Sequence, residues 1–255
     1  DRFGYFLMAL FISFVFLEFF SAEYPMNKID LFHEGQRLSA AFKSSLDGSL
    51  WSGSYIVVGV FHEIIGTKMI WSLTGHKTIG SLRFLDLTYV LITKILLIFL
   101  SFQIFKYLNL QNNLKNIFFV LFTFILLQQI NYNLSDGGVI SSREIPIILT
   151  LIFFFKSLES KSFANFIIIG LIVVGTFFWS IDRALVISLF SIYIFLYLFL
   201  SKQYVHILIF FLSLLSFSIF FSFILGFELE YFLSNTFNVF REHTYVNGII
   251  HPDLL

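Results

Sequence analysis

Seven apolar segments separated by polar connections limit the fold of this chain more than any other feature. They cover residues 3–20, 85–105, 116–130, 145–155, 163–178, 184–201 and 204–226. Several reach about 18 residues, the length at which an apolar stretch indicates a transmembrane helix. The fourth is short, and it either extends back towards Ser141 or is broken at Pro146. Because backbone groups in lipid must be satisfied within the segment, we expect all seven to be helical.

Composition supports the same class of protein. Hydrophobic residues make up 58% of the 255 residues and charged residues 13%, and the net charge is zero. The lipid bilayer is therefore an expected partner, and nothing indicates nucleic acid. The absence of cysteine excludes disulfides and thiolate chemistry. The sequence begins without methionine and ends without a closing element, so we expect residues 1–255 to be a single membrane domain, the N-terminal part of a longer protein.

The connections on the two sides of the expected membrane differ in basic residues. Short connections on one side contain two, Arg143 and Arg183. The other side contains six, namely Arg2, Lys106, Lys115, Lys156, Lys161 and Lys202. Since basic residues mark the cytoplasmic side, we expect a cytoplasmic N-terminus, an extracytoplasmic loop at 21–84 and the start of another outer loop at 227–255. The predicted fold is an all-α polytopic membrane protein with about seven transmembrane helices and a long helical first loop.

Residues 54–74 are the ambiguous stretch, because they are apolar enough to suggest an eighth span. His62, Glu63 and Lys68 would each be costly in hydrocarbon. An eighth span would also leave about as many basic residues outside as inside. We therefore expect an interfacial or re-entrant helix on the outer side.

Two ionisable residues fall within the expected spans. Lys94 lies near the middle of the second span, where it either faces the bundle interior or extends its amino group towards the headgroups. Glu18 lies close to the outer end of the first span, and we expect it at the interface.

The first outer loop contains candidate catalytic residues. Its stretch DLFHEGQRLSAAFKSSL has apolar residues at helical spacing, which predicts an amphipathic helix at the membrane surface. Asp30 and Glu34 are four residues apart on this helix and would share a face. A carboxylate in a partly dry pocket can act as a general base or hold a metal ion. His33 and the His62–Glu63 pair are further candidates, but none has the H-E-x-x-H spacing of a zinc helix, so no metal ligand is assigned.

The basic residues are sorted by type as well as by side. Cytoplasmic connections use Lys, whereas the later outer segments use Arg, and the first loop adds two more; the five are Arg37, Arg83, Arg143, Arg183 and Arg241. A guanidinium can form a two-point contact with phosphate, so these residues predict a phosphate-binding site in which Asp182 orients Arg183. The alternative is that each arginine pairs with its acidic neighbour, as in Arg143–Glu144, Arg183–Asp182 and Arg241–Glu242. Adjacent residues on a helix do not face each other, which makes that pairing poor.

The order of these features resembles the GT-C fold of integral-membrane glycosyltransferases, the group of the protein O-mannosyltransferases and bacterial aminoarabinose transferases. The resemblance consists of a first span, a long outer loop opening with an acidic motif, and then juxtamembrane helices. The stretches that carry it are DLFHEG (30–35), GSYIVVGVFHE (53–63), TGHKTIGSLR (74–83), SREIP (142–146) and WSIDRA (179–184).

The resemblance implies an enzyme of the bacterial inner membrane that transfers a sugar from a polyprenyl-phosphate donor to a lipid, protein or glycan. It implies that Glu34, with Asp30 second, is the base or assists the acceptor, and that Arg143 and Arg183 hold the donor phosphate. A divalent cation is a possible cofactor. The alternative functions are a transporter or flippase of a lipid-linked or small anionic substrate, which would need charges within spans and repeats, and a non-catalytic membrane scaffold.

Overall fold

The computed structural model describes residues 2–22, 33–52, 56–108, 111–130, 137–160 and 162–246. Within these ranges every regular element is helical, which confirms the all-α class. The elements are α1 (Arg2–Ser21), α2 (His33–Asp47), the π-helical turn η1 (Phe61–Ile65), α3 (Gly66–Thr74), α4 (Ile79–Tyr107), α5 (Asn112–Gln128), α6 (Gly137–Ser160), α7 (Phe163–Trp179), α8 (Ile181–Leu200), α9 (Tyr204–Leu225) and α10 (Glu228–Val246).

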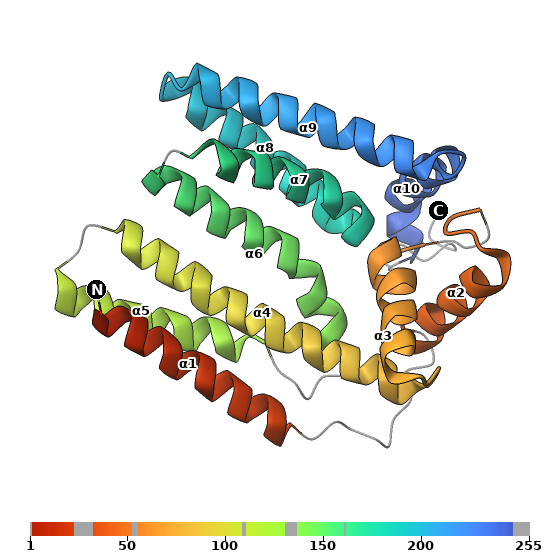
Figure 1. Ribbon diagram of the computed structural model, residues 1–255, viewed down its shortest axis with the longest axis horizontal. Helices are drawn as coiled ribbons and strands as arrows, with labels where there is room; N and C mark the ends of the chain where they lie inside the picture. Colours follow the sequence, from red (N-terminus) through yellow and green to blue (C-terminus); the bar gives the residue numbers. More distant parts are fainter. Residues whose placement is uncertain are drawn as a thin grey trace.

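The long helices form a bundle that has a cap at one end. Helices α1 and α4 to α9 lie side by side, and successive ones run in opposite directions (Figure 1). Helices α2, α3 and α10 gather at the end where α1, α7 and α9 finish and where α4, α6 and α8 begin (Figure 1). We call this the capped end. The segments expected on the outer side of the membrane are therefore brought together in space.

Four helices, α1, α4, α8 and α9, are long and apolar enough to cross a membrane. Helices α5 and α7 are apolar but have 17 residues each. Large apolar side chains lie on the outside of the bundle, with exposed fractions of 79% for Phe20 and 85% for Phe223. A soluble protein rarely exposes such a surface, so lipid is the environment that this bundle fits. The chain is a helical membrane protein, and the number of seven spans stays a prediction.

The cap contains the stretch that was ambiguous in sequence. Elements η1 and α3 have 5 and 9 residues, whereas a crossing needs about 20. This length is consistent with a helix that does not cross the membrane. The amphipathic helix expected after Asp30 forms as α2.

Two boundaries differ from those expected. The fourth segment begins at Gly137, and α6 accommodates Pro146 inside the helix. Helix α8 begins at Ile181, so Asp182 and Arg183 belong to its first turn, and Ser180 alone separates α7 from α8. An acid in a first turn is favoured there by the helix dipole, which accounts for Asp182 extending the helix.

An ion pair within the bundle joins α1 to α4. The Nζ of Lys94 lies 2.6 Å from Oε1 of Glu18, and the Lys94 side chain is 2% exposed. Of the two positions considered for Lys94, the structure therefore shows the one facing the bundle interior. Burying the lysine beside a carboxylate removes the cost of leaving its charge alone in an apolar environment.

Helix α10 holds the segment that follows α2. The carboxylate of Glu228 accepts hydrogen bonds from the backbone N–H groups of Trp51 at 3.0 Å and Ser52 at 3.1 Å. The Asn235 amide makes two bonds with the backbone of Ile56, accepting at 3.0 Å and donating at 2.8 Å. Both side chains are buried. Glu228 and Asn235 thus provide hydrogen-bond partners for backbone groups of Trp51, Ser52 and Ile56, which lie outside any helix.

We expect Glu228→Ala to loosen this attachment, because four donors, the N–H groups of Leu50, Trp51 and Ser52 and the Ser52 hydroxyl, lose a charged acceptor. The loss should be about 2 kcal/mol, seen as a lower thermal midpoint and faster proteolysis within 50–56. Glu230→Ala is the matched control, since Glu230 is exposed on the same helix. Equal effects of the two substitutions would contradict the attachment.

Candidate functional site

Two buried ion pairs fasten α2 across the beginning of α4. Arg83 contacts Glu34 at two points, with Nε to Oε1 at 2.6 Å and Nη2 to Oε2 at 3.1 Å. One turn further along both helices, Nη1 of Arg37 lies 2.7 Å from Oδ1 of Asp86. All four side chains are buried. The spacing of three residues on each helix places the two pairs side by side, with their charges in opposite order.

A histidine lies next to these pairs. His62 of η1 is 1% exposed, and its Nδ1 is 3.0 Å from the hydroxyl of Ser142 on α6. The pKa of His62 is held well below 6.5 by burial, by the guanidinium of Arg37 and by that of Arg143. An arginine of α2 and an arginine of α6 therefore both act on this ring. The ring of Tyr89 on α4 is a further neighbour of His62, with 6.2 Å between the two ring centroids.

Donor groups around His62 lack acceptors. Across the part of the chain that the structure describes, no hydrogen-bond partner meets Nε or Nη2 of Arg37, Nε of Arg143, Nε2 of His62 or the hydroxyl of Tyr89, and all are buried. Buried polar groups in folded proteins are nearly always satisfied. A group of such atoms in one place is typical of a site that holds a polar ligand or ordered water.

The turn before η1 is fixed against the start of α8. The amide of Ile181 donates to the carbonyl of Val58 at 2.7 Å. A Cβ on Gly59 would lie 2.3 Å from the carbonyl oxygen of Trp179, so only glycine fits at this position. The Trp179 ring stacks on Phe61 at 4.2 Å, and its Nε1 donates to the carbonyl of Ser142 at 2.6 Å. Elements distant in sequence are thus held around His62.

Glu63 stabilises the same turn from within. Its Oε1 accepts from the amide of Val57 at 3.0 Å and from that of Val58. Burial outweighs these hydrogen bonds and raises the pKa of Glu63 to about 7. A carboxyl group with this pKa changes its protonation near neutral pH.

Arg143 and Arg183 meet in a network at the capped end. Arg143 Nη1 lies 3.2 Å from Asp182 Oδ2, and Arg183 reaches both Asp182 at 2.8 Å and Glu144 at 2.5 Å. The side chains are between 24% and 29% exposed. The alternative of pairing with a sequence neighbour, considered poor from the sequence, occurs for Arg183–Asp182, whereas Arg143 pairs with Asp182 of the facing helix. Helices α6 and α8 both start at the capped end. The side chain of Arg183 is long enough to contact Asp182 on its own helix and Glu144 on α6.

The structure brings most of the predicted residues together at the capped end. The group contains Glu34, Arg37, Arg83, His62, Glu63, Arg143, Asp182 and Arg183. Asp30 and the side chain of His33 lie outside the described residues. Arg241 is exposed on α10. Three participants were not predicted: Asp86 and Tyr89, which fall within an expected span, and Ser142. The i, i+3 spacing of Arg83 and Asp86 is the sequence signal that could have identified Asp86.

The sequence assigns no metal ligands, although a divalent cation is a possible cofactor. Within the described ranges, no three His, Asp or Glu side chains come together as a ligand set. The possible divalent cation stays a prediction.

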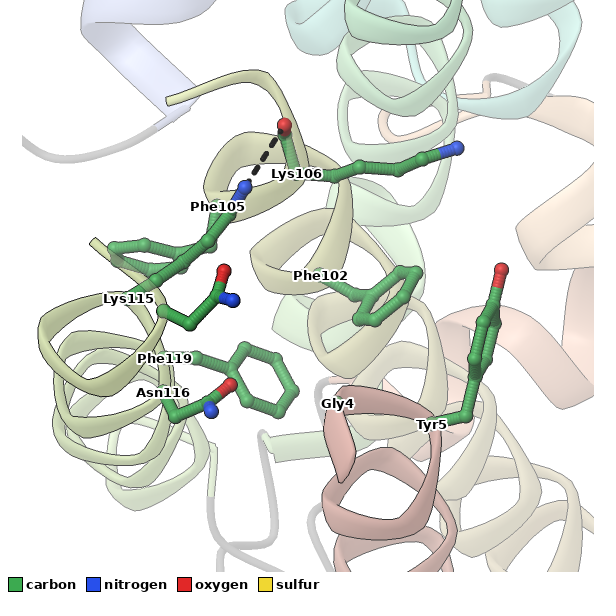
Figure 2. A pocket seen from close by; sticks show the side chains of 9 residues that line it. Gly4, Tyr5, Phe102, Phe105, Lys106, Lys115, Asn116 and Phe119 are labelled. Atoms are coloured by element: carbon green, nitrogen blue, oxygen red, sulfur yellow. Dashed lines mark hydrogen bonds between the residues drawn. The ribbon is translucent and has the colours of Figure 1, made fainter. Parts of the chain in front are cut away.

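A pocket of about 100 Å³ lies at the opposite end of the bundle, between α1, α4 and α5 (Figure 2). Aromatic rings line it, and Lys106 and Lys115 lie at its edge. Lys115 donates to the Lys106 carbonyl at 3.2 Å (Figure 2). Lys106 also pairs with Glu159 of α6 at 2.6 Å. These lysines have partners, whereas the buried guanidinium nitrogens that lack one among the described residues belong to Arg37 and Arg143 at the capped end.

Comparison with known proteins adds no assignment. No protein-family model, no curated protein and no solved structure matches this chain. The function must therefore be inferred from the site itself.

We expect Glu34→Gln to reduce stability rather than to affect chemistry alone, because the buried Arg83 then meets a neutral amide in place of the carboxylate that it contacts at two points. Breaking a buried pair on one side costs about 3 to 5 kcal/mol. The double variant Glu34→Gln with Arg83→Met should recover much of the thermal midpoint, since both charges are then removed. A single variant as stable as the unmodified protein would contradict the structural role of this pair.

The raised pKa of Glu63 predicts a pH dependence of stability. The folded protein retains a proton on Glu63 that the unfolded chain releases between pH 4.5 and about 7. Stability should therefore fall as pH rises through this window, by about 3 kcal/mol for this group. Glu63→Gln keeps an oxygen acceptor for the amides of Val57 and Val58 and should flatten the profile of thermal midpoint against pH. An unchanged slope would show that Glu63 does not titrate there.

Proposed function

We propose that this chain is the membrane part of a glycosyltransferase that takes a sugar from a polyprenyl-phosphate donor. The observation that carries the proposal is the convergence of Arg37, Arg143 and Arg183 at one end of a lipid-facing bundle. Arg37 and Arg143 each have buried N–H groups without a partner in the described chain. Guanidinium groups that lack acceptors suit a phosphate, and the apolar outside of the bundle suits a lipid carrier.

The reaction fits a site built around phosphate. The acceptor oxygen forms a bond to the anomeric carbon of the sugar while the bond from that carbon to the phosphate oxygen breaks. The electron pair remains on the phosphate, and the acceptor proton passes to a base. Arginines that hold the phosphate stabilise the charge that develops on the leaving group, which lowers the barrier in the transition state.

The geometry changes the role proposed for Glu34. Both of its carboxylate oxygens accept hydrogen bonds from Arg83. To take a proton from an acceptor, this carboxylate would have to give up one of its two contacts with the guanidinium. We therefore propose Glu34 as a positioning residue that holds α2, and with it Arg37, against α4. Asp30, the second acid implied by the resemblance, precedes α2 and lies outside the described residues.

A transporter is less well supported by the same structure. Lys94, the lysine near the middle of α4, is paired with Glu18 of α1. The polar atoms without partners that surround His62 are gathered at one end of the bundle rather than spread along a path through it. Chemistry at one membrane face is typical of an enzyme.

The proposal is tested with purified protein in proteoliposomes. Radiolabelled polyprenyl-phosphate sugars are supplied one at a time, with bacterial membranes as acceptor, and label transfer is measured. We expect transfer from at least one donor. Arg183→Lys should reduce it roughly ten- to hundredfold, because lysine keeps the charge but loses a two-point contact of about 1.5 to 3 kcal/mol.

Lys156→Gln is the control, since Lys156 is exposed on α6 and expected on the opposite face. Full transfer by both Arg183→Lys and Arg143→Gln would contradict the role of these arginines. Absence of transfer from every donor tested would contradict the proposed function itself.

A further inference from the structure

The buried groups around His62 contain more hydrogen-bond donors than the protein uses. Arg37 has donors on three nitrogens, and among the described residues only Nη1 finds an acceptor, on Asp86 at 2.7 Å. Arg143 binds Asp182 through Nη1, while its Nε is buried without a partner in the described chain. Leaving a charged donor buried and unsatisfied costs more than the hydrogen bond would contribute. Two such arginines beside one histidine indicate that an acceptor belongs there.

These donors come from three separate elements. Arg37 is on α2, His62 on η1 and Arg143 on α6, and η1 packs directly against α2. The bond from Nδ1 of His62 to Ser142 leaves Nε2 as the ring nitrogen without a partner in the described ranges. Because Ser142 precedes Arg143 on α6, the same turn that orients the imidazole also supplies one of the guanidinium groups.

We propose that Arg37, His62 and Arg143 together bind a phosphate group, with His62 as the third contact. A phosphate monoester, the group left on the lipid after transfer, offers three oxygens in a tetrahedral arrangement, which suits donors that approach from three elements. A carboxylate holds its two oxygens in one plane, which suits donors from three directions less well. The proposal deepens the proposed function by naming what holds the donor phosphate, but binding alone can test it.

Binding is coupled to protonation of His62. The charged or titratable groups that act on the ring or contact it are Arg37 on α2, Arg143 on α6 and Tyr89 on α4, and Glu63 is its neighbour in sequence. Arg37 is paired with Asp86, and Arg83 is paired with Glu34. Burial and the two guanidinium groups keep the pKa of His62 well below 6.5, so the free site contains neutral imidazole. A dianion between the arginines reverses the local charge and favours the imidazolium. The site therefore takes up a proton as the anion binds.

The sign of the pH dependence follows from this coupling. Because the bound state holds a proton that the free state lacks, affinity rises as pH falls. Sulfate is the sharpest probe, since it is a tetrahedral dianion that does not titrate near neutral pH, and any pH dependence then comes from the protein. We expect sulfate affinity to increase about tenfold from pH 8 to pH 6, within the limit of about a hundredfold that uptake of one proton allows over two pH units.

The experiment measures the thermal midpoint of the purified protein in detergent as sulfate, inorganic phosphate or farnesyl phosphate is titrated at constant ionic strength. The pH series is measured in the Glu63→Gln background, which removes the titration of the neighbouring carboxyl group. In that background His62→Gln should still bind sulfate, because the amide can donate, but should lose the pH dependence. Arg143→Gln should weaken binding at every pH; it is preferred to a change at Arg37, which would leave Asp86 buried and unpaired. His76→Gln is the matched control, since His76 is exposed in the connection between α3 and α4.

The three anions distinguish the source of the phosphate. Much tighter binding of farnesyl phosphate than of inorganic phosphate supports a lipid-linked ligand, whereas equal binding supports a free one. If no anion stabilises the protein more than chloride does, the site does not exist. If His62→Gln keeps the unmodified pH dependence, the coupling is wrong. Anion binding without sugar transfer would support this site and contradict the proposed function, so the two failures can be told apart.

Discussion

Two ion pairs buried beside an apolar bundle determine the arrangement of the capped end. Arg37–Asp86 and Glu34–Arg83 connect residues 49 positions apart, and they fix α2 across the beginning of α4. Apolar contacts between helices tolerate sliding, whereas a two-point contact between a guanidinium and a carboxylate allows one register. Because breaking either pair would strand a charge out of water, α2 has no alternative position of comparable free energy.

The rest of the site depends on that register. Helix α2 carries Arg37 to η1, and η1 is in turn fixed to α8 by the hydrogen bond from Ile181 to Val58. Helix α6 supplies Ser142 and Arg143 from the third side. Each element contributes one or two polar groups, and none of them could form the site alone. The apolar bundle therefore serves as a rigid support for chemistry located at its end.

The sequence predicted the helices well because their cause is local. Runs of apolar residues produce helices in lipid wherever they occur, and α1, α4, α8 and α9 lie where the runs do. The sorting of arginine to the expected outer segments also led to Arg143 and Arg183, which the structure brings together. These inferences needed only spacing and residue type.

Pairing was harder to predict because its cause is tertiary. Asp86 falls inside an apolar run, and nothing nearby in sequence indicates Arg37 as its partner. Glu34 was interpreted as a base because of its motif, although a contact made 49 residues later occupies both of its oxygens. His62 is one candidate among several in the sequence. What distinguishes it is tertiary: α2 places Arg37 beside it, and α6 places Ser142 and Arg143 there.

The contact between Gly59 and the Trp179 carbonyl has a consequence for recognising relatives. Charged residues at a site can be exchanged in compensating pairs during evolution, so the residue types change while the chemistry of the site is kept. Position 59 has no such freedom, since any side chain there would displace the junction of α7 and α8. A glycine three residues before a histidine, packed against the backbone of a helix junction over a hundred residues later, is therefore a feature that we expect related chains to share.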